Sequence, residues 1–166
     1  MGRLVLPEYI VLKDTREKEG WDFKPHKPER RPPRCLGTES ATLKTGDYSI
    51  KGAGENLICI ERKRDYSELF VNYSKRSLFE EECERLSHFK YKYILIESAL
   101  TRDHFSLSPP QFSKNVPGRA LLSWLSQLSM TYSINIIPVN DCGAKYATMI
   151  FEEVIRREKE LWTIQE

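Results

Sequence analysis

The stretch TGDYSIKGAGENLICIERKRD, residues 45–65, contains a short apolar run that ends in consecutive charged residues. Residues 57–60 have the composition of a core β-strand, and such strands usually end in turn residues. This one continues instead into Glu61, Arg62, Lys63 and Arg64. Side chains alternate along a strand, so Glu61 and Lys63 point to one face and Arg62 to the other. The sequence therefore predicts a strand that delivers a carboxylate and an ammonium group to the same side of a sheet.

The flanking residues suit an antiparallel hairpin around this charged end. Residues 41–50 predict one strand, residues 55–63 predict its partner, and the glycines between them mark a turn. This pairing brings Asp47, which follows a glycine, close to the end of the second strand. The glycine lets the backbone bend and lets a ligand approach closely. Asp14, at the end of a predicted strand over residues 9–14, is a further candidate acid.

Strand and helix patterns alternate along the rest of the chain. Apolar residues recur at helical spacing after Asp65, in one helix or two, and Asp65 with Glu68 resembles a capping box. Further strands are expected over residues 91–98 and 134–139, and further helices over residues 118–132 and 142–162. This order of elements predicts an α/β fold with a mixed central sheet flanked by helices.

The composition is that of one globular domain. The chain has 166 residues, of which 40% are apolar and 30% charged, which suffices for a full core and is untypical of disorder. It has no run of about 18 apolar residues and no recognisable signal peptide, so we expect an intracellular protein without a membrane span. The four cysteines lack metal-binding spacing, and we expect reduced thiols.

Positive charge is concentrated in the proline-rich segment KPHKPERRPPR, residues 24–34. The net charge of the chain is only +2, but this segment contains Lys24, Lys27, Arg30, Arg31 and Arg34 against the single acid Glu29. Because prolines disfavour helix and strand interiors, we expect an extended, exposed loop. The loop is either an ordinary solvated linker or, beside a site that handles phosphates, a nucleic-acid contact.

The acids and the lysine at the hairpin end have the chemistry of a metal-dependent phosphodiesterase. Carboxylate oxygens bind hard divalent cations such as Mg²⁺. A neighbouring lysine can position the attacking water or offset charge that develops on the phosphate. The alternative is a solvated charge run with local ion pairs, which accounts well for the Glu-x-Lys pattern taken alone. The additional Asp47 and the preceding apolar strand favour the catalytic hypothesis.

Three linked motifs resemble the nuclease domain of the XPF/Hef group of structure-specific endonucleases, a branch of the restriction-endonuclease-like PD-(D/E)xK superfamily. The motifs are Asp14-Thr15-Arg16-Glu17, Gly46-Asp47 and Glu61-Arg62-Lys63. The likeness extends to the closing helix-strand-helix and so covers nearly the whole chain. It implies a restriction-endonuclease-like three-layer fold and one nuclease domain over residues 1–166, without helix-hairpin-helix or helicase modules.

The resemblance also implies roles for individual residues. Asp47 and Glu61 would hold Mg²⁺, for which Mn²⁺ could substitute, with Asp14 as a further acid of the metal site. Lys63 would act on the nucleophilic water. Arg62 would belong to the catalytic group, although strand alternation places it on the other face. The residues expected to contact DNA are Arg16, Lys24, Lys27, Arg30, Arg31, Arg34 and Arg64.

Two features leave alternatives open. The family pattern has a last acid where this chain has Ser67, with Glu68 beside it, and Glu17 can pair with either Arg16 or Arg62. We expect a Mg²⁺-dependent endonuclease for branched or junction DNA in repair, recombination or replication, with no nucleotide cofactor. A non-catalytic DNA-binding pseudonuclease or partner subunit is the alternative, as is a resolvase or restriction-type enzyme of the same superfamily.

The two closing helices carry apolar stripes that raise the question of assembly. One stripe includes Leu121 and Leu125, and the other includes Phe151 and Ile155. One of them is needed to cover the sheet, and related nucleases pair through this part of the domain. The second stripe therefore either forms a two-fold interface, giving a homodimer through the C-terminal helices, or is buried like the first.

Overall fold

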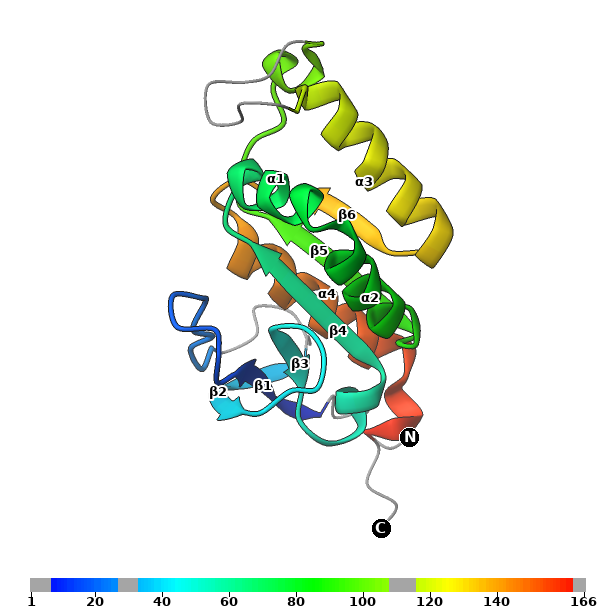
Figure 1. The fold of residues 1–166 in the computed structure, drawn as a ribbon. Helices are drawn as coiled ribbons and strands as arrows, with labels where there is room; N and C mark the ends of the chain where they lie inside the picture. Colours follow the sequence, from blue (N-terminus) through cyan, green and yellow to red (C-terminus); the bar gives the residue numbers. More distant parts are fainter. Residues whose placement is uncertain (1–6, 27–32, 108–115, 163–166) are drawn as a thin grey trace.

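Six strands form one mixed sheet in the computed structural model, which describes residues 7–26, 33–107 and 116–162 (Figure 1). The strands are β1 (Glu8–Asp14), β2 (Arg34–Ala41), β3 (Tyr48–Ile50), β4 (Ile58–Lys63), β5 (Tyr91–Ile96) and β6 (Asn135–Pro138). Their order across the sheet is β2-β1-β3-β4-β5-β6. β1 is parallel to β2, β3 is antiparallel to both β1 and β4, and β4, β5 and β6 are parallel.

Helices cover both faces of this sheet and produce three layers. The helices are α1 (Tyr66–Ser74), α2 (Arg76–Ser87), α3 (Gly118–Tyr132) and α4 (Gly143–Arg157), with short 3-10 helices at Gly52–Asn56, Arg102–Phe105 and Lys159–Leu161. α1, α2 and α3 lie on one face and α4 lies behind the sheet in Figure 1. The predicted α/β three-layer arrangement is confirmed.

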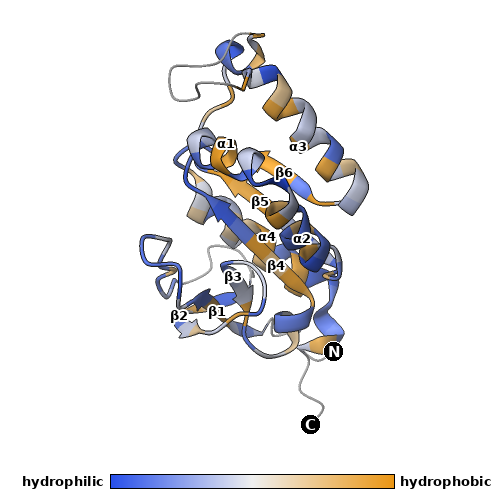
Figure 2. Ribbon diagram, viewed as in Figure 1, coloured by the Kyte–Doolittle hydropathy of each residue, from blue (hydrophilic) through white to orange (hydrophobic). Residues whose placement is uncertain are grey.

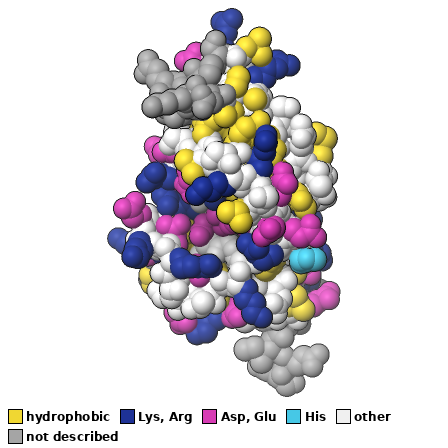
Figure 3. Space-filling view, viewed as in Figure 1, with side chains coloured by type: hydrophobic (Ala, Val, Ile, Leu, Met, Phe, Trp, Pro, Cys, Tyr) yellow, Lys and Arg dark blue, Asp and Glu magenta, His cyan; other side chains and the backbone are white. Residues whose placement is uncertain are grey.

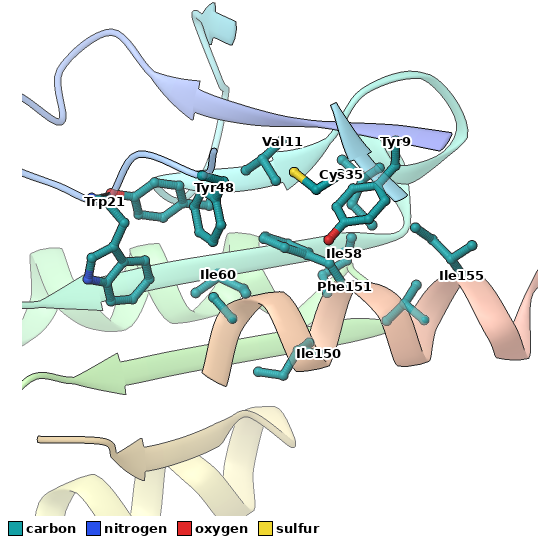
Figure 4. Packing of buried hydrophobic residues seen from close by; sticks show 14 of the residues in the cluster. Tyr9, Val11, Trp21, Cys35, Tyr48, Ile58, Ile60, Ile150, Phe151 and Ile155 are labelled. Carbon is teal, nitrogen blue, oxygen red and sulfur yellow. Dashed lines mark hydrogen bonds between the residues drawn. The ribbon is translucent and has the colours of Figure 1, made fainter. Parts of the chain in front are cut away.

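Alternation along β4 divides the buried residues into two cores. Ile58 and Ile60 belong to the core on the α4 side, where Figure 4 shows them facing Ile150 and Phe151 of α4. Cys59, between them in the sequence, belongs to the core formed with α1, α2 and α3. In Figure 2, hydrophobic colouring runs along β5 and much of β4, and the charged end of β4 is hydrophilic. The two faces of β4 therefore differ in their neighbours, which matters at its charged end.

The predicted hairpin is correct only in its inner part. β3 spans three residues and pairs with β4 through Tyr48 and Ile60, whereas residues 42–47 form no strand. The chain turns there because Gly46 has a φ of 73°, a conformation that favours glycine. β2 was not predicted, because it is an edge strand of mixed burial whose partner β1 is distant in sequence.

The helix predictions are confirmed with adjusted ends. Asp65 is the N-cap of α1, and its carboxylate accepts a hydrogen bond from the Glu68 backbone N–H over 3.0 Å. Lys75 leaves helical geometry, so the apolar pattern after Asp65 forms two helices rather than one. The terminal helix ends at Arg157, five residues before the predicted end.

Both apolar stripes of the closing helices are core residues, so of the two alternatives for the second stripe the structure supports the buried one. Leu121 and Leu125 of α3 are buried against the sheet, and so are Phe151 and Ile155 of α4. The second stripe is therefore covered within a single chain and is not exposed to a partner. No helix among the described residues is long and apolar enough to cross a membrane.

Candidate active site

Glu61 and Lys63 form a buried ion pair at the carboxyl end of β4. The Lys63 ammonium lies 2.8 Å from Oε1 of Glu61, and the two residues are only 4% and 6% exposed. Both side chains point to the face covered by α1, α2 and α3, where the Lys63 ammonium stands 5.0 Å from the centre of the Phe79 ring. The shared face that strand alternation predicted is confirmed.

Asp47 is held against the end of β4 by main-chain hydrogen bonds. Its N–H donates to the Ile60 carbonyl over 2.9 Å, and its own carbonyl accepts from the Asp14 N–H over 2.8 Å. The Arg62 N–H donates to Oδ2 of the Asp47 side chain over 2.8 Å. These bonds fix the carboxylate beside β4, and the turn at Gly46 makes this approach possible.

The two carboxylates lie in surroundings that resist their negative charge. Burial raises the pKa of Asp47 to about 6, and the charge of Glu17 adds to that rise, while the Arg62 N–H opposes it. Burial also raises the pKa of Glu61 well above its ordinary value; Lys63 opposes the rise, and Asp47 adds to it. One ammonium thus faces two carboxylates whose charges repel, a pattern that a bound cation would relieve.

Lys63 is held in its charged form by the surrounding acids. Burial alone would lower the pKa of its ammonium, but Glu61 and Glu82 raise it above the ordinary value. In these surroundings the Lys63 ammonium is suited to donate hydrogen bonds or to balance negative charge.

Asp14 is fully engaged within the loop that follows β1. Its Oδ1 accepts from the Leu43 N–H over 2.8 Å, and its Oδ2 accepts from the Arg16 N–H and from Arg16 Nε over 3.1 and 2.6 Å. Although burial raises the pKa of Asp14, the bonds from Arg16 and Leu43 lower it below its ordinary value. Within the described part of the chain, no group of three or more His, Cys, Asp or Glu side chains is placed to hold a metal. The charge of Asp47 acts on Glu61, whereas both oxygens of Asp14 are already engaged by Arg16 and Leu43.

Arg62 lies on the opposite face of β4 from Glu61 and Lys63, toward α4. Its Nη2 and Nε lie 2.5 and 2.7 Å from Oε2 of Glu97, and its Nη1 lies 3.3 Å from Oε1 of Glu17. Arg16 pairs instead with Asp14, over 2.6 Å. Of the two partners that the sequence left open for Glu17, the structure selects Arg62.

Ser67, at the position of the absent motif acid, contacts the N-cap of α1. Ser67 Oγ donates to Oδ1 of Asp65 over 2.5 Å. Glu68, the next residue, reaches back so that its Oε2 accepts from the Arg64 N–H over 2.9 Å, while its Oε1 lies 3.8 Å from the Lys63 ammonium. A carboxylate thus approaches Lys63 from the start of α1, one residue later than the family pattern places it.

Sequence reasoning missed Glu82, whose charge acts on the pKa values of both acids and of Lys63. It lies on α2, three residues after Phe79, and so on the helix face that meets Lys63. Its helical spacing from Phe79 was visible in the sequence. The packing of α2 over the end of β4 was not.

The predicted DNA-contacting residues fall into three groups. Arg16 and Arg64 flank the site with side chains that are 69% and 62% exposed, and Lys24 is also exposed. Arg34 begins β2 rather than lying in a loop, and its guanidinium is 3.3 Å from Glu8, at the end of β1 away from the site. Lys27, Arg30 and Arg31 lie outside the described residues. Figure 3 shows lysine and arginine side chains around a group of acids in the middle of this face.

Comparison with known proteins identifies the family. A solved structure described as XPF from Aeropyrum pernix matches with a TM-score of 0.56 and 19% sequence identity, covering 90% of this chain and 65% of that one. A second, described as the same protein in complex with DNA, matches with a TM-score of 0.54 and 19% identity, covering 95% of this chain and 68% of that one. No curated protein matches. The family model of the ERCC4 domain matches residues 14–146. The predicted resemblance is thus confirmed, and the chain belongs to the ERCC4 domain family.

Proposed function

We propose that this protein is a metal-dependent DNA endonuclease that hydrolyses phosphodiester bonds in branched or junction DNA. The observation that carries the proposal is the buried Glu61–Lys63 pair with Asp47 beside it at the end of β4. A purely structural ion pair would not require a second carboxylate whose charge opposes that of the first.

The donor set suits a hard divalent cation. Two carboxylates near one another, with pKa values raised by burial, attract a cation that offers them compensating charge, and oxygen ligands are those that Mg²⁺ and Mn²⁺ prefer. A bound Mg²⁺ would supply Lewis-acid activation of water and of the scissile phosphate. Asp47 and Glu61 would hold it, with the remaining ligand positions left to water and phosphate oxygens.

The protein's own side chains would orient the substrate around this site. Lys63, held charged between Glu61 and Glu68, donates hydrogen bonds to the attacking water or to a phosphate oxygen. Arg16 and Arg64 expose their guanidinium groups beside it and can bind phosphates on either side of the cleaved bond. A DNA substrate is favoured by the family and by the similar structure described as a complex with DNA.

Cleavage of a panel of labelled DNAs tests the proposal directly. We expect Mg²⁺-dependent incision of fork, flap or four-way junction DNA, weaker incision of linear duplex, and no product with a chelator. Roles in repair, recombination or replication would follow from the preferred structure. Absence of any metal-dependent product over the whole panel would refute a nuclease function.

Substitutions of the two acids test the assignment of the site. Asp47→Asn and Glu61→Gln should each reduce cleavage by at least 100-fold while leaving the fold and most DNA binding intact, because they weaken the metal site and not the distant core. Glu39→Gln is the control, because Glu39 is an acid on the edge strand β2 that forms an ion pair with Lys51 outside the site. Near wild-type cleavage by either acid variant would show that other acids hold the metal.

The presence of Ser67 at the last motif position favours a second candidate, a catalytically inactive DNA-binding partner of the same fold. In that case the protein should bind branched DNA equally well with and without Mg²⁺. The same panel decides between the two candidates, because only the enzyme yields product.

A further inference from the structure

The carboxylate of Glu97, directly after β5, joins two segments that are distant in sequence. Its Oε2 accepts from Arg62 Nε over 2.7 Å, and its Oε1 accepts from Trp21 Nε1 over 2.6 Å. Glu97 lies on the α4 side of the sheet, opposite to Glu61 and Lys63. Its carboxylate is thus engaged by Arg62 and Trp21 and not by Lys63.

The surroundings of Glu97 leave little freedom for these bonds to rearrange. The Trp21 ring stacks on Tyr48 with ring centres 4.9 Å apart, and its backbone N–H donates to the Tyr48 hydroxyl over 2.6 Å. At Gly143, the first residue of α4, a Cβ atom would lie 2.3 Å from the Trp21 ring and 3.1 Å from the Glu97 carboxylate. Trp21 is therefore fixed between Tyr48, Glu97 and the first turn of α4.

Arg62 connects this cluster to the other face of the sheet. Its guanidinium is fixed by Glu97 and Glu17, while its backbone N–H donates to Oδ2 of Asp47 over 2.8 Å. This N–H lies at the end of β4. Glu97 therefore holds the Arg62 side chain on the α4 side of the sheet, while the Arg62 backbone binds Asp47. A change in the setting of Arg62 would shift the hydrogen bond that orients the Asp47 carboxylate.

We propose that Glu97 is a positioning residue of the metal site, acting through Arg62 to orient Asp47, with Trp21 holding Glu97 in place. The inference rests on the proposed function, because it assumes that Asp47 binds a cation. Groups that orient metal ligands in this way typically change metal affinity by about 10- to 100-fold when removed. The proposal gives Arg62 a role in shaping the site, in place of the direct catalytic role that the resemblance implied.

The test measures binding of Mn²⁺ to the whole chain by calorimetry, without DNA. Glu97→Gln keeps the shape of the side chain and an oxygen for Trp21 but removes the charge that holds Arg62. We expect Mn²⁺ to bind about tenfold more weakly to this variant. With DNA, kcat at a fixed Mn²⁺ concentration should fall while KM for DNA stays unchanged, because the contacts to DNA are untouched.

Glu158→Gln provides a matched control at the opposite end of β5. Glu158 accepts from Lys90 and from the Tyr91 hydroxyl, so it also bridges a cation and an aromatic donor, and its exposure of 18% is close to the 20% of Glu97. We expect this variant to lose stability like Glu97→Gln and to bind Mn²⁺ as the wild type does. If the role of Glu97 is purely structural, the two variants should show the same change in stability and the same affinity for Mn²⁺.

A double-mutant cycle tests whether Glu97 acts through Arg62. Arg62→Met removes the guanidinium and keeps the backbone N–H, so adding Glu97→Gln to it should weaken Mn²⁺ binding no further. Additive losses, or wild-type affinity in Glu97→Gln, would overturn the proposal.

If Glu97→Gln does not fold, Trp21→Phe serves instead, because it retains the stacking on Tyr48 and lacks the N–H that donates to Glu97. This variant should bind Mn²⁺ about threefold more weakly than the wild type, and unchanged affinity would overturn the proposal. Failure of the wild type itself to bind Mn²⁺ would refute the proposed function instead.

Discussion

Asp47 is a carboxylate that the fold holds in an unfavourable charged state. In the folded chain its pKa rises from 3.8 to about 6, chiefly through burial. At pH 7 both the folded and the unfolded chain carry this carboxylate charged, and the folded chain bears the cost of doing so. Functional sites often retain a charged group that destabilises the fold, because the group is needed for binding or catalysis.

Asp47→Asn should therefore stabilise the metal-free protein at pH 7, by about 2 kcal/mol. The amide oxygen can still accept from the Arg62 N–H, and the buried charge is gone. Because the folded state binds the proton more tightly, the wild type regains this stability as the pH falls through about 6, and the advantage of the variant should disappear by about pH 4. Urea unfolding with chelator between pH 4 and 8 measures the difference. An Asn variant that is less stable at pH 7 would contradict the pKa rise.

Local patterns explain which site residues the sequence could predict. Alternation along one strand was sufficient to place Glu61 and Lys63 together and to separate Arg62 from them. The partner of Arg62 could not be chosen in the same way, since Glu97 is 35 residues away and meets it only because β4 pairs in parallel with β5. Asp14 had the right residue type at a strand end, but nothing in the sequence showed that Arg16 and Leu43 would use both of its oxygens.

At the scale of elements, the turn before β3 depends on a glycine for two separate reasons. Gly46 has a φ of 73°, and a Cβ atom there would lie 2.1 Å from the Cys59 sulfur and 3.2 Å from the Ile60 carbonyl oxygen. Gly52 has a similar φ of 80°, but a Cβ atom there would meet nothing within 4 Å. The pair thus separates backbone strain from steric overlap.

Gly46→Ala should destabilise the protein by at least about 2 kcal/mol more than Gly52→Ala. Both substitutions incur the left-handed backbone cost of about 1–2 kcal/mol, and only the first also forces its methyl group into a buried sulfur. Chemical denaturation of the two variants gives the comparison, and Cys59→Ala in the Gly46→Ala background should restore part of the loss. Equal losses in the two variants would mean that Cys59 moves aside without cost.

The elements themselves were predictable where their pattern was local and strong. Residues 118–132 were predicted as a helix with the observed ends, because apolar residues recur there at helical spacing and Pro117 precedes the first turn. β2 was missed because only one of its eight residues, Cys35, is buried, while the neighbouring Arg34 and Leu36 are exposed. Its place in the sheet comes from pairing with β1, which no local pattern records.

At the scale of the whole molecule, the mixed sheet brings the site and its positive charges to one edge. The parallel strands β4, β5 and β6 end at the same edge, where the Glu97 N–H donates to the Lys63 carbonyl and the Val139 N–H donates to the Ile96 carbonyl, each over 2.8 Å. β1 brings Asp14 and then Arg16 to the same region, because Asp14 bonds to Asp47. The opposite end of β1 lies about 20 Å away, since Glu8 and Asp14 are six steps of about 3.3 Å apart along the strand.

DNA bound at this edge should depend on Arg16 and Arg64 and not on Arg34. Each arginine that contacts a phosphate releases about one counterion, so the double variant Arg16→Ala/Arg64→Ala should lower the slope of log affinity against log salt by about two. Arg34 lies at the far end of β1, away from the site, so Arg34→Ala removes one positive charge without removing a predicted phosphate contact and is the control. Binding of a fork DNA over a series of salt concentrations, in chelator to prevent cleavage, gives the three slopes. A slope reduced equally by Arg34→Ala would mean that the DNA extends along β1 and β2, and a slope unchanged in the double variant would place the DNA away from the proposed site.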